Sequence, residues 1–151
     1  MFRLNLAVCA LTCFSTYASA EEWGHWRGPL SNGFTEGAPP VQWSASKNVK
    51  WKVEIPGAGS GSPVVWGDQV FVVTSVPGKK NPREFQFQLH CFDRKTGKAI
   101  WARTATEAMP HQETHNTNTH ASASPCTDGK HVYAHFGSRG LYCYTMSGEL
   151  K

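Results

Sequence analysis

Apolar and polar residues alternate with the two-residue period of β-strands through most of the chain. The clearest case is residues 83–93, where Phe85, Phe87 and Leu89 share one face and glutamines lie between them. The same period predicts further strands at residues 49–55, 62–66, 69–75 and 99–104. No helical period interrupts them. We therefore predict an all-β fold in which residues 45–151 are almost entirely strand and turn.

The chain also repeats itself. Residues 62–71 are matched by residues 124–133 at an offset of 62, with Ser, Pro, Gly, Val and an aromatic residue in common. The strand at residues 89–93 is matched by residues 141–145 at an offset of 52. Repeats of roughly this length are typical of propellers and solenoids, and four short antiparallel strands per unit are typical of a propeller blade.

Tryptophan and glycine fix the phase of the repeat. Trp51 and Trp101 are 50 residues apart. Gly97 lies in the turn that begins at Asp93 and precedes Trp101, and Gly148 lies in a degenerate second copy of that turn. We predict that the two tryptophans pack at equivalent places on successive units. Counting four residues on from Gly148, as from Gly97 to Trp101, passes the last residue, so we expect the chain to be the front of a longer protein.

The glycine-rich run at residues 57–61 lacks the Gly-Lys-Ser/Thr ending and the following helix of a phosphate-binding loop. We interpret it as a close backbone approach between units. A second irregularity is an insertion of 12 residues before the second unit, which includes residues 107–115. Repeat architectures accept insertions in loops rather than in strands.

Residues 1–20 have a basic start, an apolar stretch and an Ala-Ser-Ala ending, which predicts a secretory signal peptide. The apolar stretch is too short to span a bilayer. Residues 21–44 are predicted to form a turn-rich N-terminal segment, followed by blades over 45–151. Removing Arg3 with the signal leaves 14 basic and 11 acidic residues, scattered without a nucleic-acid footprint.

Three cysteines remain after the signal, namely Cys91, Cys126 and Cys143. An odd number leaves at least one free thiol or a partner elsewhere in a longer chain. Cys91 and Cys143 hold equivalent repeat positions, which would separate them by more than a disulfide spans. We interpret all three as small buried apolar residues and leave their pairing open.

The string Asp93-x-Lys-Thr-Gly97-Lys-x-x-Trp101 and the repeated Ser-Pro strand pair resemble the pyrroloquinoline-quinone-like (PQQ-like) β-propeller repeat family. Residues 26–33 and 118–125 look most like its secreted, BamB-like members of the planctomycete kind. The resemblance covers nearly all of residues 23–151. It implies a ring of seven or eight four-stranded blades, of which about two are present here.

The resemblance leaves the function open, because one fold serves both enzymes and scaffolds. Quinoprotein dehydrogenases of this fold carry PQQ and calcium, with an adjacent cysteine pair, a tryptophan platform and central carboxylates. No adjacent cysteine pair follows the signal segment here, so we assign no catalytic and no cofactor-binding residue. PQQ and calcium are expected only under this alternative function.

One polar cluster suggests metal binding, because imidazoles are common metal ligands. Its candidate ligands are His111, His115 and His120. Pro110 and the polar run at residues 114–119 disfavour the helix that would put the first two on one face. We therefore expect no metal site. His131 and His135 are interpreted as solvated or hydrogen-bonded histidines on one face of a strand.

These observations favour an exported, periplasmic or extracellular propeller that acts as a non-catalytic binding or assembly scaffold. The expected partners are a protein or small ligand on a propeller face and the remaining blades, with no nucleic acid and no membrane span. The alternative is a PQQ-dependent oxidoreductase with active-site residues outside this sequence.

Overall fold

The computed structural model describes residues 22–151, and the predicted signal peptide lies outside them. The described chain is all-β, as the alternation predicts, and contains a single short 3₁₀ turn, η1 (Gly137–Arg139). Its strands are β1 (Val64–Trp66), β2 (Gln69–Pro77), β3 (Phe85–Asp93), β4 (Ala99–Ala108), β5 (Cys126–Thr127), β6 (His131–His135) and β7 (Leu141–Thr145). Among residues 22–151 there is no helix with the length and apolar character needed to span a membrane.

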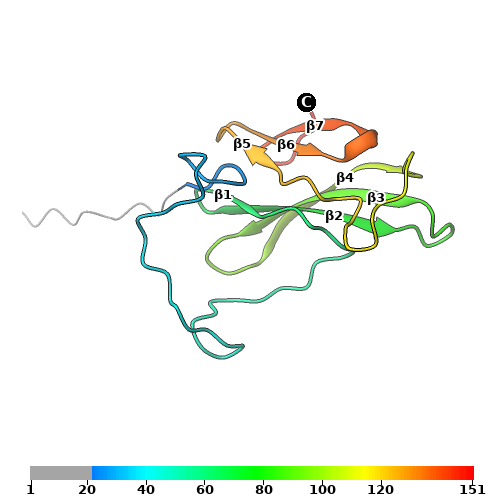
Figure 1. Cartoon of the computed structure of the whole chain (residues 1–151). Coiled ribbons are helices and arrows are strands. Elements are labelled where there is room, and N and C mark those ends of the chain that lie inside the picture. The colour runs from blue at the N-terminus through cyan, green and yellow to red at the C-terminus, as the bar shows by residue number, and fades with distance from the viewer. Residues whose placement is uncertain (1–21) are drawn as a thin grey trace, which may run out of the picture.

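Strands β1 to β4 form one antiparallel sheet in sequence order (Figure 1). The two-residue turn after Trp66 joins β1 to β2, because Trp66 pairs directly with Gln69. β2 and β4 run further than the alternation predicts, to Pro77 and Ala108. These strand ends have partners on β3, so the backbone ladder continues to the last residue of each strand.

Strands β5, β6 and β7 form a second antiparallel sheet that repeats the pairing of the first. In the first sheet Phe71 pairs with Val64 on one side and Cys91 on the other. In the second, the matching sequence positions pair in the same way, with Tyr133 between Cys126 and Cys143. The sequence offsets of 62 and 52 residues are therefore offsets between equivalent strand positions.

The two sheets pack face to face, with β5 to β7 above the larger sheet in Figure 1. The core between them consists of buried residues from both. The first sheet supplies Val64, Phe71, Val73, Phe87, Leu89, Cys91 and Trp101, and the second sheet with its connector supplies Ala121, Val132, Ala134, Phe136 and Tyr144. Burial of this apolar surface is the main force that holds the sheets together.

The packing is back to front, because the sheets present opposite faces to the core. The first sheet presents the face that carries Phe71. The second presents Val132 and Tyr144, whose equivalents in the first sheet, Val70 and Phe92, lie on its other face. A repeated unit that stacks in this way leaves one front face free, here the face of β5 to β7 around Tyr133. Head-to-tail stacking can continue to a ring or a filament.

The predicted strand at residues 49–55 is wrong, because its backbone has no ladder partner among residues 22–151. The side-chain alternation nevertheless persists in part. Trp51 and Ile55 are half-buried, whereas Lys52 and Glu54 are exposed. Alternation reports which side of an extended chain is buried, but a strand also needs a neighbour for its backbone groups. In Figure 1 this segment runs along the side of the first sheet opposite β5 to β7.

Trp51 and Trp101 make matching contacts. The Nε1 of Trp51 donates to the Arg94 carbonyl at 2.8 Å, and that of Trp101 donates to the Met146 carbonyl at 3.1 Å. Each indole also covers the glycine of the turn it binds: a methyl group on Gly97 would lie 2.7 Å from Trp51, and one on Gly148 would lie 2.8 Å from Trp101. The geometry therefore recurs from one sheet to the next.

The glycine-rich run is a close approach of backbones, as predicted. A methyl group on Gly59 would lie 2.3 Å from the Val73 carbonyl oxygen, and one on Gly61 would lie 2.7 Å from that of Ala123. The Ser60 N–H donates to the Ala121 carbonyl at 3.0 Å. Side chains larger than glycine would separate this segment from both sheets.

We expect Gly97→Ala to destabilise the protein more than Gly67→Ala does. Both glycines have positive φ, 73° and 57°, so each substitution carries the left-handed backbone strain of about 1–2 kcal/mol. A methyl group at Gly67 meets open space, whereas one at Gly97 collides with the Trp51 ring. Urea denaturation of the two variants measures the difference, which is the cost of the collision. Equal losses would contradict a close indole contact.

Candidate functional site

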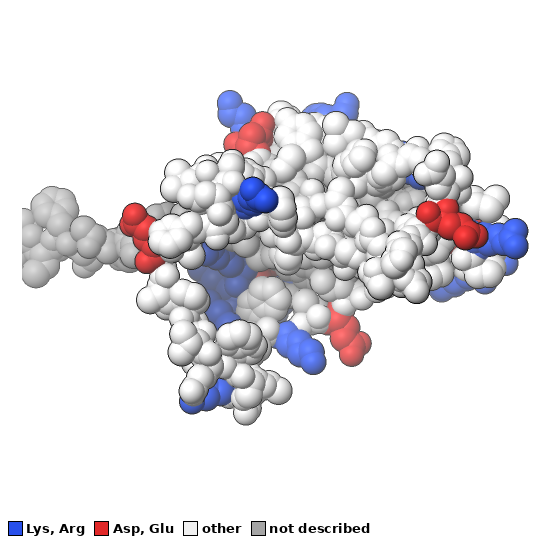
Figure 2. All heavy atoms as spheres, in the orientation of Figure 1, with Lys and Arg blue, Asp and Glu red and all other residues white. Residues whose placement is uncertain are grey.

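Charged side chains are scattered over the molecule, and in Figure 2 no single sign of charge dominates the visible face. The two hollows in the surface lie at one end of the two sheets. There the segment after β4 that contains most of the insertion passes next to η1, the short turn between β6 and β7. We call this segment the connector (residues 109–122). The loop after β2 borders the same region. The candidate site is therefore built by loops, which the two sheets hold in place.

The connector separates two hollows. The first, of about 290 Å³, lies between the connector and η1 and is lined by Phe87, Pro110, Gln112, Glu113, Thr114, Thr119, His120, Ser122, Ala123, His135, Phe136, Gly137, Ser138 and Arg139. The second, of about 390 Å³, faces the loop after β2 and is lined by Pro82, Arg83, Phe85, Met109, Pro110, His111, Gln112, Glu113 and His120.

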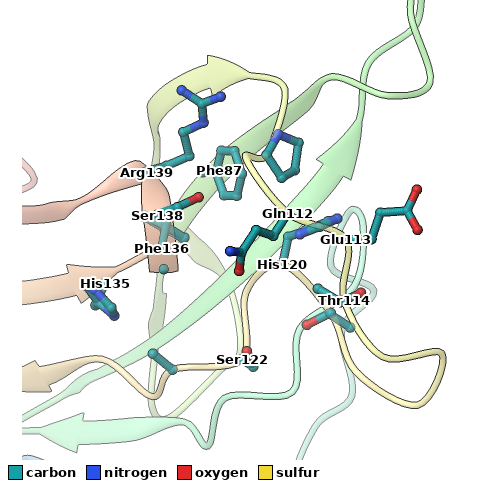
Figure 3. Close-up of a pocket in the computed structure, with 14 residues that line it drawn as sticks. Phe87, Gln112, Glu113, Thr114, His120, Ser122, His135, Phe136, Ser138 and Arg139 are labelled. Atoms are coloured by element: carbon teal, nitrogen blue, oxygen red, sulfur yellow. The ribbon is translucent and has the colours of Figure 1, made fainter.

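Aromatic residues form the inner wall of the first hollow, and polar groups from the connector form its opposite wall. Phe136 packs against Phe87 with ring centroids 5.4 Å apart, which fixes the end of β6 against β3. Figure 3 shows Gln112 reaching from the connector toward η1, while His120 and Glu113 point the other way. The hollow thus combines a rigid floor with a polar, exposed rim.

Two of the three metal candidates, His111 and His120, line the second hollow, but the three candidates are not gathered at one point. His120 packs on the Phe85 ring, with centroids 4.6 Å apart. The His115 imidazole instead bonds within its own turn, where its Nδ1 lies 2.9 Å from the Thr117 hydroxyl. The backbone N–H of His111 donates to the Ser138 hydroxyl at 3.4 Å. Across residues 22–151 no three His, Cys, Asp or Glu side chains gather closely enough to hold a metal ion.

The described residues do not fit the calcium and quinone centre of the alternative function. That centre needs clustered carboxylates and an adjacent cysteine pair. Glu113 is the one carboxylate that lines either hollow, and the thiols in the described chain are all free. No chemical step through PQQ is therefore derived for these residues.

Burial of the three thiols differs, which corrects the expectation for Cys126. Cys91 is fully buried, Cys143 is half-buried and Cys126 is exposed on the free face of β5 to β7. Cys126 and Cys143 flank β6, so they are about 9–10 Å apart, beyond the reach of a disulfide. Burial raises the pKa of the Cys91 thiol to about 12, and the hydrogen bond from Gln69 offsets only part of this shift.

One buried polar pair lies outside the hollows. His90 and Thr74 are buried neighbours on β3 and β2, and the His90 Nε2 lies 2.9 Å from the Thr74 hydroxyl. Burial lowers the pKa of His90, so the imidazole stays neutral at neutral pH. Nothing in the alternation of β3 distinguishes this histidine from an exposed one.

The sequence located the connector as an insertion but did not identify the hollows. His120 was singled out as a metal candidate, whereas Gln112, Ser122 and Arg139 were not singled out at all. Their common signal is weak: they lie in two loops 16 or more residues apart, and only the stacking of the sheets brings these loops together.

No protein-family model matches the chain, and no curated protein matches it.

Proposed function

We propose that residues 45–151 form successive blades of a PQQ-like β-propeller in an exported protein that acts as a binding or assembly scaffold. The observation that carries the proposal is the back-to-front packing of two sheets with the same repeated pairing. Head-to-tail stacking of one repeated unit is what a ring of blades requires.

Two features support a binding role. The connector is an insertion between otherwise matching units, and its polar residues line both hollows. Binding residues are commonly carried by loops on a rigid scaffold. Export is supported by the basic start, the apolar stretch and the Ala-Ser-Ala ending of residues 1–20.

A dye-reduction assay tests the scaffold function against the oxidoreductase. The whole chain is supplied with PQQ and calcium, and reduction of an artificial electron acceptor is followed with alcohols and with sugars. We expect no reduction above the rate without protein. A known quinoprotein dehydrogenase serves as the positive control, and reduction by this chain that depends on added PQQ would overturn the scaffold proposal.

A further inference from the structure

Each of the two hollows is lined by one arginine whose side chain has no hydrogen-bond or ring partner among the described residues. Five arginines lie within residues 22–151. Three of them are engaged: Arg27 over the Trp26 ring at 4.5 Å, Arg94 with the Gly67 carbonyl at 3.3 Å, and Arg103 with the Gly148 carbonyl at 2.7 Å. Arg83 and Arg139 have no such contact to any described residue, and each lines one of the hollows.

Arg139 is the more constrained of the two. Its Nε is buried and has no hydrogen-bond acceptor among residues 22–151. A donor that has lost water without gaining an acceptor is unfavourable, and more so when it is charged. The carboxylate of Glu113 lines the same hollow but points away in Figure 3 and forms no ion pair within the described chain. The first hollow therefore has a fixed positive charge and no anion that balances it.

The other polar groups of the first hollow are suited to hydroxyl groups. Gln112, Thr114 and Ser122 make no side-chain hydrogen bond to any described residue, and the Ser138 hydroxyl accepts only the long bond from the His111 N–H. An amide and hydroxyls can each donate and accept. A volume of about 290 Å³ is at the lower end of small-molecule sites, which suits a ligand the size of one sugar ring.

We propose that the hollow between the connector and η1 binds a sugar acid, a small molecule that carries one carboxylate and several hydroxyl groups. The carboxylate pairs with the guanidinium of Arg139, since guanidinium and carboxylate match in plane and charge. Gln112 bonds the hydroxyl groups, and Phe136 with Phe87 forms the apolar floor. The proposal deepens the binding role proposed above, and it rests on that role.

Isothermal titration calorimetry of the whole chain tests the proposal with three probes: glucuronate, glucose as its uncharged counterpart, and inorganic phosphate. We expect glucuronate to bind, and glucose and phosphate each to bind at least about tenfold more weakly. Arg139→Gln should weaken glucuronate binding at least about tenfold, because a hydrogen bond to a charged group is of that order. Arg94→Gln is the matched control and should leave the affinity unchanged, because Arg94 lies outside both hollows.

Three outcomes would overturn the proposal: no glucuronate binding by the unaltered chain, equal binding of glucose or phosphate, or an unchanged affinity after Arg139→Gln. Gln112→Ala, in the exposed connector, is a second variant in case Arg139→Gln does not fold, and it should weaken glucuronate binding as well. Failure here is separable from failure of the scaffold function. PQQ-dependent dye reduction would refute the scaffold function and leave the sugar-acid site standing. A failure of glucuronate to bind would refute the sugar-acid site and leave the scaffold function standing.

Discussion

Replacing Trp101 with alanine is expected to lower the free energy of unfolding by about 3–5 kcal/mol, the usual cost of truncating a buried tryptophan. Trp101 is 8% exposed and lies between the sheets, with its ring centroid 5.8 Å from that of Phe71 and 6.4 Å from that of Tyr144. The substitution leaves a cavity between elements that are far apart in sequence, so neither sheet can close it alone. Equilibrium urea denaturation measures the loss.

Two comparisons isolate this effect. Trp43→Ala removes an indole that is 71% exposed and should change stability by no more than about 0.5 kcal/mol. Trp101→Phe keeps an aromatic ring and should recover part of the loss. The Met146 carbonyl keeps a second donor, the Gln69 amide at 3.1 Å, so most of the loss is packing rather than hydrogen bonding. A loss below about 1 kcal/mol would show that Trp101 does not hold the sheets together.

Self-association of the described polypeptide, residues 22–151, is the second large effect that we expect. The free face of β5 to β7 carries Tyr133, Cys126, Leu141 and Cys143, and its equivalent in the first sheet is the face that the second sheet covers. An open face of this kind associates with a second copy. Tyr133→Glu places a charge at its centre and should convert the associated species to monomer.

Sedimentation velocity at several protein concentrations measures this change. Ser46→Glu adds the same charge on an exposed turn away from the sheets and should leave the association unchanged. Circular dichroism checks that both variants keep their β-structure. A monodisperse monomer with a cooperative melt before any substitution would contradict the prediction.

The location of the candidate site was only partly predictable. The mismatch between the two units revealed the connector, because an insertion shows itself against a repeat. The hollow depends on Phe87 from β3, His120 from the connector and Arg139 from η1. These residues meet across the interface between sheets, and no local pattern records that meeting. Of the three candidate ligands, His115 bonds within its own turn at Thr117, whereas His111 and His120 both line the second hollow.

The strands and their order follow from local patterns alone, because alternation and tight turns act over a few residues. The repeat also identified equivalent positions, such as Phe71 and Tyr133, from spacing alone. Local patterns could not show that residues 49–55 form no strand, because a ladder needs a second segment alongside. The same holds for exposure: Cys91 and Cys143 match in sequence and pairing, yet one is fully buried and the other is not. Burial is set by which face the neighbouring sheet covers, and that is a property of the packed molecule.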